Sequence, residues 1–138
     1  FSFSGLKTAA RRVIAAARAV EGLPPDDPDV RLSEGAVAEL SWGFQDSVVD
    51  VLVTKTIRAA AATDARCIVL GGGVAANAAL RARLAGEAEG RGLSLVIPRP
   101  ALCTDNGAMI GAAGARRLAA GDLAGLDLDA RPSLPLAS

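Results

Sequence analysis

The chain has 138 residues, no net charge at neutral pH, and a composition that is 51% hydrophobic and 22% charged. These proportions supply enough apolar material for a packed core and exclude an intrinsically disordered chain. The balanced charge weakens a nucleic-acid function for this chain and does not exclude RNA contact through another domain. Because histidine is absent, a Ser-His-Asp triad or a complete histidine-based metal site cannot be built from this chain alone.

Cysteine usage and hydropathy indicate the cellular setting. Cys67 and Cys103 lack CxxC spacing, which favours a reducing, cytoplasmic location over a disulfide scaffold. Cys67 stands in an apolar run and is predicted to be buried. No apolar run approaches the roughly 18 residues of a membrane span, and no signal peptide opens the sequence. The start at Phe1, without methionine, suggests a piece of a longer protein.

The first half of the sequence predicts a strand end and a helix before a proline-rich loop. Residues 1–4 (FSFS) alternate aromatic and polar side chains, as a short strand does. Alanine and arginine, both strong helix formers, dominate residues 5–20. Three prolines and three aspartates in residues 21–29 predict a solvated loop.

A long helix is predicted over residues 33–63, with Ser33 as its N-cap. Gly43 is expected to permit close packing along this helix. The residues expected to form its stripe at steps of three and four are Val37, Leu40, Phe44, Val48, Val51, Leu52 and Lys55.

The second half predicts a strand–helix–strand unit. A strand is predicted over residues 66–71, apolar from Cys67 onward, that should be covered on both faces, and a second strand is expected near 93–97. Helices are predicted over 74–92 and 104–121. The fold class is therefore α/β, a small mixed sheet with helices on both faces. The sequence predicts one lobe over residues 1–121 and an irregular tail over 122–138.

The turn after the first apolar strand is the main candidate binding site. Missing side chains at Gly71, Gly72 and Gly73 let a ligand approach the backbone, and the following helix offers free N–H groups. The amide of Asn77 can orient a ribose or a phosphate without adding charge. The alternative is a tight turn that needs positive φ and binds no ligand.

Two known phosphate motifs compete at this turn. Gly71, Gly73 and Ala76 satisfy G-x-G-x-x-[GA], the dinucleotide fingerprint. That function requires an acidic residue after the next strand, where this chain reads VIPRP. The P-loop pattern fails because no G-K-[ST] follows the glycines.

Two further segments carry candidate polar residues. Thr104 or Asp105 either caps the helix that opens at this point or, for Asp105, binds a metal or lies in a nucleotide cleft. Lys7 follows the FSFS segment and is either a phosphate contact or an ordinary solvated lysine.

Taken together, FSFSGLKT, GGVAANAALR and P-x-L-CTDNGAMI resemble, in order and spacing, the tRNA adenosine threonylcarbamoyltransferase family of TsaD type. The similarity runs from Phe1 to about Gly121. The resemblance implies the C-terminal lobe of an actin-like ATPase fold, as in sugar kinases and chaperones. It implies transfer of a threonylcarbamoyl group from threonylcarbamoyl-AMP to N6 of adenosine 37 in tRNAs that read codons beginning with A.

The resemblance also assigns residues and partners. Asn77 matches the family asparagine that binds the adenylate, and Gly72 and Gly73 match the glycines beside it. Asp105 matches an aspartate that binds a divalent metal, iron or zinc, whose other ligands are histidines absent from this chain. The implied partners are tRNA, a paralogous subunit and a small ATPase, with no membrane contact.

The missing His-x-x-x-His segment predicts that this chain is inactive alone, since catalytic metal sites usually need about three protein ligands. The alternatives are another ATPase or phosphotransferase of the same superfold and a nucleotide-binding interaction module. A protease function is disfavoured because the chain has no nucleophile–histidine pair.

Overall fold

The structure is a computed structural model and describes residues 2–25 and 27–129. Contacts within the chain divide it into two compact units, Phe1–Cys103 and Thr104–Ser138, and each unit is described by itself. Among the described residues, the first unit holds three α-helices and the sheet, and the second holds one α-helix.

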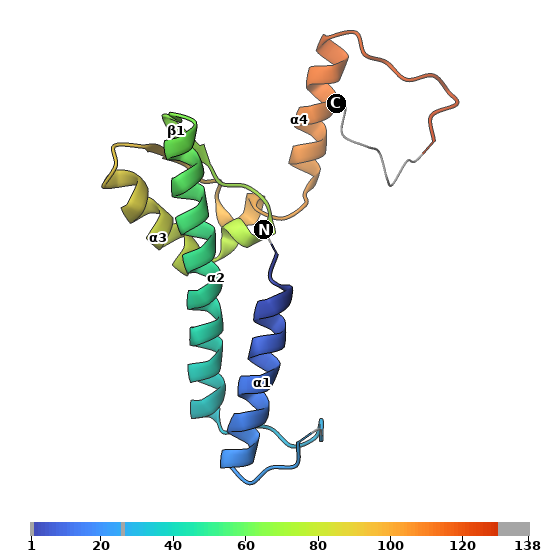
Figure 1. Cartoon of the computed structure of the whole chain (residues 1–138). Coiled ribbons are helices and arrows are strands. Elements are labelled where there is room, and N and C mark those ends of the chain that lie inside the picture. Colours follow the sequence, from blue (N-terminus) through green and yellow to red (C-terminus); the bar gives the residue numbers. More distant parts are fainter. Residues whose placement is uncertain (1, 26, 130–138) are drawn as a thin grey trace. The chain divides into compact units, whose positions relative to one another are not determined.

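Two helices open the first unit as an antiparallel pair, α1 (Ser4–Val20) and α2 (Glu34–Ala62) (Figure 1). The loop between them is held by side chains at its two ends. Arg18 donates to three backbone carbonyls of the loop, at 2.7 to 3.0 Å. The Glu21 carboxylate accepts from both the hydroxyl and the backbone N–H of Ser33. The proline-rich loop is thus tied to its flanking helices by specific hydrogen bonds.

The predicted strand at the start of the chain is wrong for the described residues. Ser2 and Phe3 form no strand, and α1 begins at Ser4, while Phe1 lies outside the described residues. The backbone N–H of Lys7 donates to the Phe3 carbonyl, so Lys7 belongs to the first turn of α1 and not to a strand-to-helix turn. The helix propensity of the alanine-rich segment that follows outweighs the aromatic–polar alternation of residues 1–4, so the helix begins at Ser4.

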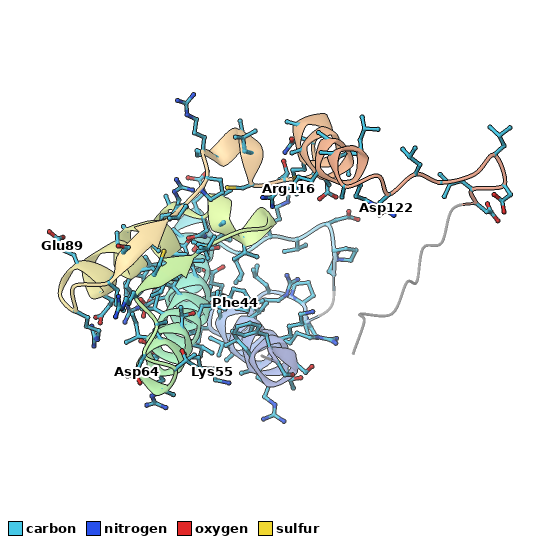
Figure 2. All side chains as sticks on the ribbon, turned by 90° about the horizontal axis from the view of Figure 1, so that it is seen from above. Phe44, Lys55, Asp64, Glu89, Arg116 and Asp122 are labelled. Carbon is cyan, nitrogen blue, oxygen red and sulfur yellow. The ribbon has the colours of Figure 1, made fainter. Side chains whose placement is uncertain are left out.

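Ser33 caps α2 as predicted, because its Oγ accepts from the backbone N–H of Ala36 at 3.3 Å. The predicted stripe along α2 is wrong in its burial. The buried residues of this helix are Val49, Val53, Ile57 and Ala60. The N-terminal half instead borders an apolar groove beside α1, where Phe44 lies between the two helices (Figure 2). Gly43 also lines this groove, and a Cβ there would meet nothing within 4 Å.

A parallel βαβ unit follows α2, as the sequence predicts. Strands β1 (Cys67–Val69) and β2 (Ser94–Val96) pair in parallel, with Ile68 opposite Leu95. The short 3₁₀ helix η1 (Gly73–Ala76) and helix α3 (Ala78–Glu89) connect them. In Figure 1, α3 lies beside α2, and Leu80 and Leu84 of α3 join Ile68 and the buried residues of α2 in one core.

The sheet differs from the prediction in two respects. Among the described residues it has two strands, both parallel, and is not mixed. Its faces are also unequal: Ile68 is buried, whereas Cys67 and Val69 are exposed on the opposite face. Because side chains alternate along a strand, α2 and α3 cover one face, and no described residue buries the other. The prediction that Cys67 is buried is therefore wrong.

The chain leaves β2 through the 3₁₀ helix η2 (Pro100–Leu102), which ends at the buried Cys103. The second unit contains α4 (Gly107–Ala119), and residues 122–129 form no helix or strand. Arg116 lies in the last turn of α4, and Asp122 follows the end of that helix (Figure 2). Within residues 2–25 and 27–129, no helix combines the length and the apolar character needed to cross a membrane.

Candidate functional site

The glycine turn follows directly from β1 and bends the chain into η1. Leu70 still donates to the β2 carbonyl of Val96, so the turn begins where strand pairing ends. Gly72 adopts φ +85° and ψ 171°, a backbone conformation that is nearly restricted to glycine. Its carbonyl accepts from Ala75, whose side chain is fully buried and anchors the turn to the core.

Gly71 and Gly73 have no comparable structural requirement in this chain. Neither has positive φ, and a Cβ added to either would meet nothing within 4 Å. Both glycines therefore border open space, and only Gly72 is demanded by the backbone. This arrangement leaves room for a ligand to approach the main chain, as the functional hypothesis requires.

Asn77 is the N-cap of α3, and its side chain is held at both ends. Its Oδ1 accepts from the backbone N–H of Leu80 at 2.9 Å, and its Nδ2 donates to Gln45 Oε1 at 3.0 Å. The predicted helix start at residue 74 is wrong, because the chain first makes η1 and begins α3 at Ala78. The Asn77 amide is thus oriented by the protein beside the glycine turn.

Arg81, one turn along α3, is a site residue that sequence reasoning missed. One guanidinium nitrogen, Nη1, donates to the carbonyls of Ala75 and Pro98, each at 2.9 Å. The same nitrogen lies 3.8 Å from the sulfur of buried Cys103. Arg81 therefore joins η1 to the segment that leaves β2. Its place four residues after Asn77 was the available signal, because positions i and i+4 share a helix face.

Asp105 does not cap α4, and neither does Thr104. Asn106 is the N-cap: its Oδ1 accepts from the backbone N–H of Met109 at 3.1 Å. The capping alternative for Asp105 is wrong, and its side chain is exposed just before the helix. An exposed carboxylate without a capping role is free to serve as a ligand.

The described residues do not complete a metal site. Nowhere in this part of the chain do three or more histidine, cysteine, aspartate or glutamate side chains gather around a potential ion position. Asp105 alone supplies one carboxylate, and structural and catalytic metal sites use three or four protein ligands. Asp105 and the glycine turn belong to different compact units, and the metal-binding or nucleotide-cleft role of Asp105 stays a prediction.

The structure therefore brings together Gly71–Gly73, Asn77 and Arg81 at the carboxyl end of β1. Ligands of open parallel α/β sheets bind at the carboxyl ends of the strands. The fold and the turn thus define an α/β protein with a candidate phosphate-binding turn. Lys7 is exposed on α1 and is not part of this turn.

Comparison with known proteins identifies the family. The sequence pattern of the TsaD family, described as tRNA N6-adenosine threonylcarbamoyltransferase, matches residues 1–112. The chain belongs to this family, which confirms the resemblance. Relatives that carry this name occur in Sorangium cellulosum, with 49% identity over 98% of the chain, and in Bacillus subtilis, with 46% identity over the whole chain. A Geobacter sulfurreducens relative of the same name is 47% identical.

These alignments also define how much of the family the chain represents. It spans 35% of the Sorangium relative and 37% of the Bacillus relative, so it covers about a third of their length.

Proposed function

We propose that this chain supplies the adenylate-binding turn of a tRNA N6-adenosine threonylcarbamoyltransferase. The observation that carries the proposal is the pairing of the family match with an open glycine turn beside the oriented amide of Asn77. The donor is threonylcarbamoyl-AMP, and the acceptor is N6 of adenosine 37 in tRNAs that read codons beginning with A. The lobe over residues 1–121 adopts an actin-like ATPase fold and works in the cytoplasm.

The turn acts mainly by positioning the donor. Gly72 and Gly73 let the phosphate of the adenylate approach the main chain. Asn77 Nδ2 directs one hydrogen to Gln45, which leaves its second amide hydrogen for the ligand. In the transfer, N6 forms a bond to the carbamoyl carbon and releases one proton to solvent, while the bond from that carbon to the AMP oxygen breaks and AMP leaves. Since AMP is a good leaving group, correct placement of the two reactants supplies much of the catalysis.

The metal and the partner proteins of this proposal are those that the sequence resemblance implies. Asp105 is one ligand of a divalent ion, iron or zinc, which would stabilise negative charge in the reaction when bound. Its other ligands, histidines, lie outside this chain. The protein acts on tRNA together with a paralogous subunit and a small ATPase. The 138-residue chain is inactive by itself.

The proposal is tested by threonylcarbamoyl transfer to tRNA in vitro, with the adenylate and the partner proteins supplied. The full-length protein should form product, and its Asn77→Ala variant should bind AMP at least about tenfold more weakly, the loss expected for one hydrogen bond to a charged group. Arg83→Gln is a matched control on the same helix, because Arg83 pairs with Asp46 and Asp50 of α2 and not with the glycine turn or Asn77. Unchanged AMP affinity in Asn77→Ala, or product from the 138-residue chain alone, would contradict the proposal.

A further inference from the structure

Arg81 occupies an unusual position for a charged residue of α3. It is half-buried, and Nη1 makes its hydrogen bonds to carbonyl oxygens of two separate segments. Among the ion pairs that the described residues form, none includes Arg81. Burying a guanidinium costs free energy that hydrogen bonds must offset, so these two carbonyl contacts carry its structural role.

The two carbonyls belong to segments that do not follow one another in the chain. Ala75 lies in η1, the 3₁₀ turn that follows the glycines, and its side chain is completely buried. Pro98 follows β2, and its carbonyl is 3.9 Å from the sulfur of Cys103, at the end of η2. η1 and η2 are also in contact with each other. The Arg81 side chain thus spans the junction between the glycine turn and the segment 98–103.

We propose that Arg81 is a positioning residue for the adenylate-binding turn, holding η1 against residues 98–103 so that the glycine backbone keeps its ligand-binding shape. This inference rests on the function proposed above for the turn. Arg81 does not need to touch the ligand, because it acts through the carbonyl of Ala75, three residues after Gly72. A turn fixed before binding saves the ordering cost that a mobile turn would add to each binding event.

The helix itself provides a matched comparison. Arg81 and Arg83 are two residues apart on α3 and have the same side chain, but Arg83 is exposed and pairs with Asp46 and Asp50. Substitution of Arg83 therefore removes an arginine from the same helix without releasing η1. An effect of Arg81 substitution that Arg83 substitution does not share is therefore assigned to the half-buried Arg81 side chain and its contacts with Ala75, Pro98 and Cys103.

Two measurements on the full-length protein test the inference. The first is the alkylation rate of Cys103, read from the Cys103 peptide by mass spectrometry in a Cys67→Ser background, because Cys67 is exposed and Cys103 is buried. Arg81→Gln should raise this rate at least about tenfold by local opening, while Arg83→Gln stays within about twofold. The second is AMP affinity per folded molecule, which Arg81→Gln should weaken by about tenfold, the loss expected for hydrogen bonds to a charged group.

A merely destabilising effect would lower the folded fraction without changing the affinity of the molecules that remain folded. Arg81→Lys guards against an unfolded variant: lysine keeps the charge but is one bond shorter and lacks the planar fork. Arg81→Lys should therefore show a smaller increase in Cys103 alkylation and a smaller loss of AMP affinity than Arg81→Gln.

Unchanged Cys103 alkylation in both Arg81 variants would overturn the positioning role. Faster alkylation with unchanged AMP affinity would overturn the link to the ligand. A wild-type protein that binds no AMP would overturn the proposed function, and with it this link.

Discussion

Asn77 and Gln45 join α3 to α2 through a hydrogen bond of 3.0 Å between residues that are 32 positions apart in the sequence. The other end of the Asn77 amide caps α3 at Leu80. A residue proposed to bind ligand is thus already fixed by two elements of the fold. The capping role of Asn77 depends on Oδ1, and its proposed binding role depends on Nδ2. Substitutions that change one of these atoms and keep the other can therefore separate the two roles.

We expect Asn77→Asp to leave stability nearly unchanged while it weakens ligand binding. Aspartate caps helices about as well as asparagine, and Gln45 can turn its amide to donate to the new carboxylate. The added negative charge should repel the phosphate and raise the dissociation constant for AMP at least about tenfold. Asn77→Ala should instead lower the free energy of unfolding by about 1 kcal/mol through loss of the cap.

Thermal unfolding and equilibrium AMP binding of the two Asn77 variants make the comparison. If Asn77→Asp binds AMP as tightly as the wild type, Asn77 does not face the anion and its role is confined to the cap.

Substitutions of the turn glycines should also distinguish effects on stability from effects on AMP binding. Gly72→Ala forces a side chain into φ +85° and should cost about 1–3 kcal/mol of stability. Gly73→Ala has open space for its Cβ and no positive φ, so its stability should change by less than about 0.5 kcal/mol. Its AMP affinity should nevertheless fall, because the methyl group occupies the space that the ligand needs.

Chemical denaturation and AMP titration of the two glycine variants decide this point. Gly71→Ala is a second variant with open space around the new Cβ. Normal AMP affinity in both Gly71→Ala and Gly73→Ala would show that the open face of the turn is not approached by the adenylate.

The sequence predicted the elements whose signals are local. Ser33 as N-cap and the strand–helix–strand unit depend on neighbouring residues, and both appear in the structure. The sequence did not predict which face of α2 is buried. Apolar residues lie on several faces of this helix, and packing against α3 selects Val49 and Val53. The contacts of Arg81 were missed for a related reason. Its place one turn after Asn77 is a local signal, but its partner Pro98 is 17 residues away and becomes visible only in the folded chain.

Asp105 should matter for metal content and not for folding. It is exposed, and Asn106 performs the capping of α4. Asp105→Asn in the full-length protein should therefore keep the unfolding midpoint and weaken metal binding at least about tenfold, since even outer-shell substitutions cost that much. Asp122→Asn is the matched control, an exposed aspartate of the same unit that pairs with Arg117.

Metal content is measured by elemental analysis after dialysis against a weak chelator. If Asp105→Asn retains as much metal as Asp122→Asn, Asp105 is not a ligand of the metal.

The loop between α1 and α2 should respond to pH through Glu21. The hydroxyl of Ser33, and then its backbone N–H, hold the pKa of the Glu21 carboxyl below its ordinary value of 4.5. A carboxyl whose pKa is lowered by folding stabilises the native state above the unfolded pKa, and this contribution disappears as the pH falls through the lower, folded pKa. Glu21→Gln should therefore be less stable than the wild type at pH 7, and the difference should shrink below about pH 4.

Thermal unfolding of both proteins between pH 3 and pH 7 measures this difference. Ser33→Ala tests the cause: it should itself cost about 1 kcal/mol as a lost N-cap, and in its background Glu21→Gln should have a smaller effect at pH 7, because the hydroxyl that it engages is gone. A Glu21→Gln effect that is constant across the pH range, or undiminished by Ser33→Ala, would mean that the Glu21–Ser33 bond does not hold this loop.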